Sequence, residues 1–305
     1  MRHLLVAALS IAALAAHAQA PPRLKLYSAG RGSAFLPYAE RLASVLTSEG
    51  ISVTVVETNG SIENMGHLNE EADAIATVFL GSAVEGYTAS ANWTDGAKYT
   101  NVRALFPMYE TSFQAVALAS SGIRSLRDLR GKRVGVGPEG GPAMLYFNGI
   151  STAAGLQAHA VPGQPAELSA ALLRNEIDTL WQGAIPPIPT LLQVLDGAPA
   201  TVFGLTMQEQ DLALNRFPYL TRATVPAHTY PAQPVALRTI GAWNFVYSNK
   251  ALPAEIAEAV TRVALAHGDQ LAPGTRPANA VSNTVVPFHD GALRYYRGAG
   301  IGVRR

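Results

Sequence analysis

The chain has 305 residues, with 23 basic side chains, 22 acidic side chains and no cysteine. Because the charges balance and no basic stripe is present, we expect no nucleic-acid partner, and without cysteine there can be no disulfide and no lipid attached through a thiol. A chain of this length is long enough for two α/β domains, each with its own core.

The first twenty residues have the pattern of a secretory signal peptide. A short positive start is followed by an apolar run from Leu4 to Ala16 and by the small-x-small sequence Ala18-Gln-Ala20. The run is too short for a membrane-spanning helix with its flanks. An uncleaved anchor is the alternative, but we expect cleavage after Ala20 and a mature protein, from Pro21 onward, that is periplasmic, soluble and monomeric.

The stretch from Leu24 to Tyr38 predicts a strand, a turn and the start of a helix. Residues 24–27 form the strand, residues 28–33 form a glycine-rich turn that contains Arg31, and apolar residues recur at helical spacing from Ala34 onward. Such a turn directs backbone N–H groups and the positive end of the helix dipole to one point, which suits a small anion. A purely structural turn is the alternative. We therefore assign a binding role to this turn only because the same strand–turn–helix unit recurs along the chain.

The same unit occurs twice more before residue 88. Strands are predicted at 51–57 and 74–79, and each ends in a turn of small or polar residues that leads into a helix, at Thr58–Ser61 and at Leu80–Ser82. This βαβ series predicts a largely parallel sheet. The carboxyl ends of its strands lie along one edge, where ligands bind in open α/β sheets.

The pattern begins again after two predicted strands at 102–108 and 113–119. Further strands are predicted at 132–136, 158–161, 177–181 and 201–205, with helices at 142–154, 165–174 and 189–195 between them. A late strand at 243–248 and an amphipathic helix at 253–267 return the chain to the first series. The sequence therefore predicts two lobes, lobe 1 from residues 21–112 plus 246–305 and lobe 2 from residues 113–245.

No motif for catalysis or metal binding emerges. None of the histidines in the body or tail of the chain is spaced i, i+4 from another, and no G-x-S-x-G elbow or Walker loop is present. The glycine pairs Gly30-Arg-Gly32 and Gly135-Val-Gly137 lack the third glycine of a dinucleotide fingerprint. We therefore expect no enzyme activity, no metal and no cofactor.

The turns that remain predict a ligand site between the lobes. Backbone amides and hydroxyls supply the donors, Arg31 is the only cation, and Tyr109 and Trp181 are flat platforms. This set suits a small carboxylate with an apolar body, although each residue taken singly could be structural. The predicted ligand-binding residues are Arg31, Gly32, Ser33, Asn59, Gly60, Ser61, Phe79, Tyr109, Gly137, Glu139, Gly140, Gly141, Trp181, Gly183 and Ile185.

Five segments, in order through nearly the whole mature chain, resemble motifs of one family. They are Glu57-Thr-Asn-Gly-Ser-Ile-Glu-Asn64 (similar to E-S-T-G-G-S-V-E-N), Leu68-Asn-Glu-Glu-Ala-Asp73 (L-N-x-G-E-A-D), Ser125-Leu-Arg-Asp-Leu-Arg-Gly-Lys-Arg-Val-Gly-Val-Gly-Pro138 (S-L-x-D-L-K-G-K-R-V-x-V-G-P), Ala223-Thr-Val-Pro-Ala-His-Thr-Tyr-Pro231 (A-T-I-P-A-G-T-Y-P) and Val286-Pro-Phe-His-Asp-Gly-Ala-Leu-Arg-Tyr-Tyr296 (V-P-L-H-P-G-A-x-R-Y-Y). The chain thus resembles the TAXI family, the extracytoplasmic receptors of tripartite ATP-independent (TRAP) transporters.

The resemblance implies a two-lobed periplasmic-binding-protein fold of the type II kind, with two mixed sheets flanked by helices and joined by crossing hinge strands. It implies a receptor that closes on a small organic acid or amino acid, such as glutamate, and delivers it to a TRAP-type membrane permease. A receptor for an ABC importer or for a sensory partner, using the same cleft, is the alternative, and an enzyme on this scaffold is less expected.

Two departures from the family pattern bear on the ligand. Phe79-Leu-Gly stands where relatives often have a Gln-Ser-Asp-like turn, and Gly140-Gly-Pro142 stands where a serine–glycine–threonine run is common. Both changes remove polar side chains. We expect a ligand less polar than glutamate that is still a carboxylate.

Overall fold

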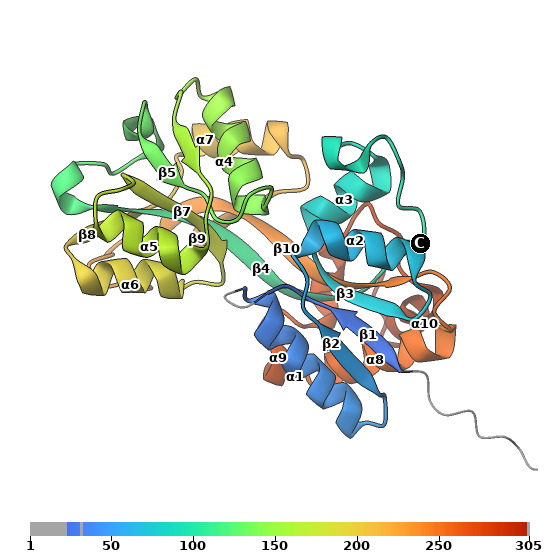
Figure 1. Cartoon of the computed structure of the whole chain (residues 1–305). Coiled ribbons are helices and arrows are strands. Elements are labelled where there is room, and N and C mark those ends of the chain that lie inside the picture. The colour runs from blue at the N-terminus through green and yellow to red at the C-terminus, as the bar shows by residue number, and fades with distance from the viewer. Residues whose placement is uncertain (1–22, 31–32, 304–305) are drawn as a thin grey trace, which may run out of the picture.

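The computed structural model of the chain describes residues 23–30 and 33–303. The predicted signal peptide with its cleavage site, and the predicted ligand residues Arg31 and Gly32, lie outside these residues. The description below follows Figure 1.

Lobe 1 is the half of the molecule built on three parallel strands, each followed by a helix. Its elements are β1 (Leu24–Tyr27), α1 (Phe35–Ser48), β2 (Val53–Val56), α2 (Ser61–Glu70), β3 (Ala74–Phe79) and α3 (Leu80–Thr88). Strand β1 lies between β2 and β3 and pairs in parallel with both. The strands predicted at 24–27 and 74–79 are confirmed, because short runs of apolar residues bounded by turn residues favour buried strands.

Two long strands, β4 (Val102–Leu118) and β10 (Leu237–Asn249), run from one half of the molecule to the other and pair antiparallel (Figure 1). The prediction of two strands at 102–108 and 113–119 was wrong, because the chain stays extended through the polar residues between them. Cross-strand partners explain this: Glu110 accepts a hydrogen bond from Thr221, and Asn244 donates to Thr111. Polar side chains that find such partners do not interrupt a strand.

Lobe 2 is the half built on the second series of strands. Its elements are β5 (Arg133–Gly135), α4 (Pro142–Ala153), β6 (His159–Val161), α5 (Pro165–Leu173), β7 (Thr179–Ala184), α6 (Pro189–Gly197), β8 (Ala200–Phe203), α7 (Met207–Arg216) and β9 (Thr221–Val225). The sequence analysis did not identify α7 or β9. Helix α7 has a local signal, since Thr206 and Glu209 form a capping box at its start.

After β10 the chain returns to lobe 1. Helices α8 (Ala254–Ala266), α9 (Gly268–Leu271) and α10 (Asp290–Gly298) lie on the lobe 1 side in Figure 1, and α10 packs against α8. Short 3-10 helices lie at Asn92–Thr94, Ala119–Ser121, Leu126–Leu129 and Pro277–Ser282. A parallel bridge joins Ala104 of β4 to Phe288, in the segment that leads into α10.

The ten strands of the described residues belong to one hydrogen-bonded sheet, in the order β2-β1-β3-β10-β4-β7-β5-β6, with β8 on β4 and β9 on β10. Helices flank this mixed sheet, and among the described residues buried apolar side chains form one cluster in lobe 1 and two in lobe 2. Alternate residues of β4, Ala115 and Ala117 against Val116 and Leu118, belong to the two lobe 2 clusters, so these clusters lie on opposite faces of the strand.

The predicted two-lobed α/β fold with flanking helices is therefore confirmed. The prediction of two separate mixed sheets was wrong, because β10 pairs with β3 of lobe 1 and β4 pairs with β7 of lobe 2, so the paired crossing strands join both lobes in one sheet. The predicted boundaries at 112/113 and 245/246 fall inside β4 and β10, so the exact division stays a prediction.

Among the residues that the structure describes, no helix is both long enough and apolar enough to cross a membrane. The same residues contain no group of three or more histidine, aspartate or glutamate side chains placed to hold a metal ion.

Candidate functional site between the lobes

The carboxyl ends of strands from both lobes meet at the crossing strands. In lobe 1, β3 ends at Phe79, which lies opposite Asn244 of β10. In lobe 2, β7 ends at Ala184, which lies opposite Ser112 of β4, and Ser112 in turn lies opposite Gly241 of β10. The ends of β3 and β7 thus lie at positions that are three residues apart along β10. This edge is where open α/β sheets bind ligands.

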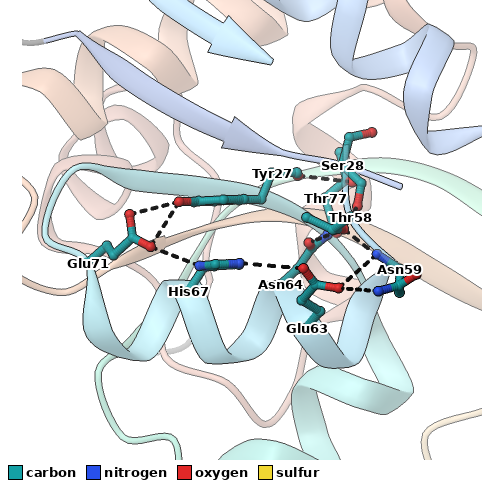
Figure 2. Close-up of polar contacts among 10 residues, drawn as sticks. Tyr27, Ser28, Thr58, Asn59, Glu63, Asn64, His67, Glu71 and Thr77 are labelled. Carbon is teal, nitrogen blue, oxygen red and sulfur yellow. Dashed lines mark hydrogen bonds and ion pairs between the residues drawn. The ribbon is translucent and has the colours of Figure 1, made fainter. Parts of the chain in front are cut away.

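In lobe 1, Asn64 of α2 holds the ends of three strands together, as Figure 2 shows. Its Nδ2 donates to the carbonyl oxygens of Ser28 (2.6 Å) and Thr77 (2.8 Å). The Thr58 hydroxyl, at the end of β2, lies 2.7 Å from the Asn64 Oδ1 and also 2.7 Å from the Ser28 carbonyl oxygen. One buried amide therefore fixes the turn that the sequence assigns to the ligand.

Within this turn, the predicted ligand residues bind mainly to protein groups. The Asn59 side chain is exposed, and its backbone N–H and Nδ2 both donate to Glu63 (2.9 and 2.7 Å). The Ser61 hydroxyl oxygen accepts the N–H of Phe79 (3.0 Å). Gly60 has φ +104°, a conformation that favours glycine. These contacts shape the turn and join it to the end of β3.

Helix α2 is tied to β1 by a second set of polar contacts, also drawn in Figure 2. The ring of His67 stacks on Tyr27 at 3.9 Å, and Glu71 accepts hydrogen bonds from Lys25 (2.7 Å) and from the Tyr27 hydroxyl. Burial pushes the pKa of Glu71 upward, but the hydrogen bonds from Lys25, Tyr27 and His67 outweigh it and lower that pKa to about 2. Helix α2, and with it the turn at its start, is therefore held firmly against the sheet.

The turn before α1 contains Ser33, whose hydroxyl oxygen accepts the N–H of Phe35 (3.1 Å). The serine thus supports the first turn of the helix, one residue earlier than a standard cap. Arg31 and Gly32, which precede it, lie outside the described residues.

In lobe 2, the turn from β5 into α4 is a glycine loop. Gly137 is buried with φ +76°, whereas Glu139 and Gly140 are exposed. The N–H of Gly141 donates to the carbonyl of Pro138 (3.0 Å), and the Gly141 carbonyl then accepts the N–H of Leu145 in α4. Free backbone groups at the start of a helix suit an anion, as the sequence analysis proposed for this loop.

Aromatic rings from both lobes pack together beside this loop. Phe113 of β4 stacks on Trp181 of β7, with ring centroids 5.9 Å apart, and meets Phe79 and Tyr146 at 6.2 and 5.3 Å. All four rings are almost fully buried. The predicted residues Phe79 and Trp181 are therefore brought together, in a cluster that also contains Phe113 and Tyr146, which the sequence analysis missed.

Gly183, another predicted ligand residue, is shaped by this cluster. A Cβ atom at Gly183 would lie 2.3 Å from the Phe113 ring, so a glycine is required there for the ring to lie flat against β7. Ile185, two residues further on, is one of the few large apolar residues with an exposed side chain. The end of β7 thus presents an apolar surface.

Four buried polar atoms near the strand ends and crossings have no hydrogen-bond partner within the described part of the chain. They are Ser28 Oγ, Tyr109 Oη, Trp181 Nε1 and Asn244 Oδ1. Burial raises the pKa of the Tyr109 hydroxyl, so this group stays a neutral donor. Tyr109 and Trp181 were predicted from the sequence as ligand-binding residues. Asn244 was not predicted, although an amide side chain inside an otherwise apolar strand could have indicated it. Unpaired buried groups are rare in native proteins, and each calls for an explanation such as a bound water, ion or other partner.

The two lobes, the crossing strands and the opposed strand ends define a protein of the periplasmic-binding-protein architecture. The family comparison is more specific. A model of the NMT1-like family matches residues 26–300, and the chain belongs to this family.

Solved structures share the fold at low sequence identity. Rpa4515 of R. palustris with adipate is 16% identical over 92% of this chain and 93% of that one, with a TM-score of 0.57. The periplasmic binding protein BugD is 13% identical over 92% and 99%, with a TM-score of 0.55. MatC from Rhodopseudomonas palustris with bound malate is 11% identical over 80% and 85%, also with a TM-score of 0.55.

Proposed function

We propose that this protein is an exported solute receptor that binds a small carboxylate between its lobes and passes it to a TRAP-type permease. The observation that carries the proposal is the meeting of strand ends from both lobes at β10, beside buried polar atoms that lack a partner. The sequence pattern at residues 1–20 supports export to the periplasm, and the TAXI-like motifs support the TRAP-type partner.

The character of the site supports a ligand with an apolar body. Four buried rings lie at the junction, and the turns from both lobes offer backbone N–H groups rather than charged side chains. Arg31 is the one cation that the sequence places in these turns, and a guanidinium pairs well with a carboxylate. The carboxylates named for Rpa4515 and MatC, adipate and malate, are compatible with this class.

The proposed mechanism is closure without chemical change of the ligand. The lobes would rotate about β4 and β10, and a ligand that contacts both lobes would stabilise the closed arrangement by its differential affinity for that state. Ligand-binding residues from lobe 1 and lobe 2 would then enclose it together. They are the residues predicted from sequence, with Phe113, Tyr146 and Asn244 added from the structure.

A thermal-shift screen tests the proposal. We expect apolar mono- and dicarboxylates to raise Tm more than glutamate does, and arginine to have little effect, because the turns offer donors and one cation. The substitution Arg31→Ala should abolish the shift, whereas Arg130→Ala, at an exposed position in lobe 2, should leave it unchanged. Strong stabilisation by glutamate, with none by apolar carboxylates, would contradict the ligand class.

The permease partner needs a separate test. A TRAP-type permease from the same organism, reconstituted in vesicles, should take up the identified ligand only when the receptor is added, and without ATP. ATP-driven uptake through an ABC importer would contradict the partner while leaving the receptor function intact.

A further inference from the structure

A buried carboxylate joins the two lobes outside the predicted ligand turns. Glu85 lies on α3 of lobe 1 and is 7% exposed. Its Oε1 accepts a hydrogen bond from the hydroxyl of Tyr219 (2.5 Å), which follows α7 in lobe 2, and its Oε2 accepts one from Trp93 Nε1 (3.1 Å). The contact therefore links residues 134 positions apart in sequence and on opposite sides of the crossing strands.

The donors to this carboxylate are neutral. In the part of the chain that the structure describes, no lysine, arginine or histidine forms an ion pair with Glu85, so its hydrogen bonds come from a phenol and an indole. Burial, followed by the charge of Glu85, raises the pKa of Tyr219, so the phenol keeps its proton. Hydrogen bonds to an ionised acceptor are stronger than those between neutral groups, and they strengthen further away from water.

The close approach of the lobes at this point depends on Gly81, at the start of α3. A Cβ atom at Gly81 would lie 2.2 Å from the Tyr146 hydroxyl oxygen and 2.6 Å from the Tyr219 ring. The rings of Tyr146 and Tyr219 meet edge to face, with centroids 6.2 Å apart. Two tyrosines of lobe 2 thus cover a position in lobe 1 that has no side chain.

Packing beside this contact is incomplete. A cavity of about 270 Å³ lies next to it, with lining residues from α3, from the segment after α7, and from the 3-10 helix at Pro277–Ser282 with the residues that follow it. Val281 and Val285 on its wall are exposed. The interlobe contact here therefore consists of the hydrogen bonds of Glu85 together with the packing of the Tyr146 and Tyr219 rings around Gly81.

We propose that Glu85, Tyr219 and Gly81 form an interlobe latch that sets the balance between open and closed arrangements and thereby the affinity for the ligand. The part concerning affinity rests on the proposed function; the part concerning lobe closure does not. Opening the lobes separates the phenol from the carboxylate. Since apparent affinity scales with the population of the binding-competent state, loss of the latch weakens binding without removing any ligand contact.

Distance measurements between spin labels test the latch directly. The chain has no cysteine, so Lys98→Cys in lobe 1 and Asn215→Cys in lobe 2, both at exposed positions, allow specific labelling. In the labelled protein without ligand, Tyr219→Phe should shift the distance distribution toward longer values. Gly81→Ala, which inserts a methyl group between the lobes, should shift it in the same direction.

Tyr230→Phe is the matched control, because Tyr230 is also buried and hydrogen-bonded, but to Gln114 and Ile188 within lobe 2. It should leave the interlobe distance unchanged. Identical distributions for Tyr219→Phe, Gly81→Ala and Tyr230→Phe, in variants with native circular dichroism, would overturn the latch.

Ligand titrations complete the test. With the carboxylate that gives the largest thermal shift, Tyr219→Phe should raise the apparent Kd about 3- to 10-fold, and Tyr230→Phe should change it less than twofold. If no carboxylate binds, the proposed function fails while the distance measurements still decide the latch. If Tyr219→Phe changes the interlobe distances but not the Kd, the contact controls lobe closure without affecting ligand affinity. The part of the proposal that concerns affinity is then wrong.

Discussion

The two halves of the candidate site are built by different forces. In lobe 1, hydrogen bonds donated by Asn64 and Thr58 fix the turn at the strand ends (Figure 2), and the Ser61 hydroxyl oxygen accepts the N–H of Phe79. In lobe 2, stacked rings, with Phe113 against Trp181, position the corresponding edge, and the main polar contacts there are those of Tyr230 with Gln114 and Ile188. Directional bonds hold a turn in one conformation, whereas ring packing fixes the position of an edge and leaves its glycine turn adaptable.

This difference suggests a division of roles. We expect the lobe 1 turn to be organised before a ligand binds, and the lobe 2 loop, with exposed Glu139 and Gly140, to adjust on closure of the lobes. Three substitutions test this difference between the two lobes.

The largest effect is expected at Phe113, where the rings of both lobes meet. Phe113→Ala removes a fully buried ring that contacts Phe79, Tyr146 and Trp181, and should lower the free energy of unfolding by about 3–5 kcal/mol. Urea unfolding, monitored by tryptophan fluorescence, measures this loss of unfolding free energy. Phe113→Leu, which keeps most of the apolar volume, should cost clearly less. A loss below about 1 kcal/mol for the alanine variant would show that the cluster does not hold the junction.

An intermediate effect is expected at Asn64. Asn64→Ala removes the donor that serves the carbonyls of Ser28 and Thr77, and should lower the free energy of unfolding by about 1–3 kcal/mol. It should also weaken ligand binding, because the Thr58–Ser61 turn loses its support.

Asn69→Ala provides the matched control, since Asn69 lies on the same helix and bonds to Asn101 away from the turn. It should lower stability but leave ligand affinity unchanged, as measured by calorimetry. Equal losses of affinity in both variants would contradict the role of Asn64 in organising the turn.

The smallest effect is expected at Glu71, and it should depend on pH. The pKa of this carboxyl is lowered from 4.5 to about 2 in the folded protein, so its contribution to stability is present above about pH 4.5 and is lost as the pH falls toward 2. Glu71→Gln should therefore lower stability at pH 7 by less than about 1 kcal/mol, because the group is partly exposed, and should flatten the loss of stability on acidification.

Thermal unfolding at a series of pH values, compared with that of Glu70→Gln at the exposed neighbouring position, checks the Glu71 prediction. An acid profile identical to that of the unsubstituted protein would show that the contacts of Glu71 with Lys25 and Tyr27 contribute nothing measurable.

The sequence by itself determined most of the strands and helices and their order, although not α7, β9 or the continuity of β4. The strands at Leu24–Tyr27 and Ala74–Phe79 and the helices that begin at Ser61 and Pro142 follow from local patterns, namely short apolar runs, helical spacing and proline at a first helical position. The alternation of strand and helix also predicts that strand ends gather at one edge, because that geometry is common to all parallel βαβ units.

Only the tertiary structure decided which side chains from distant segments pair with one another at those strand ends. That β4 runs unbroken through its polar middle depends on Asn244 and Thr221, more than 100 residues away, and the contact between Glu85 and Tyr219 exists only because the chain crosses twice between the lobes. Hydrogen bonds and ring packing between distant segments leave no periodicity in the sequence. Local patterns therefore specify which segments become strands and helices, while pairing across the fold specifies which of their side chains face one another.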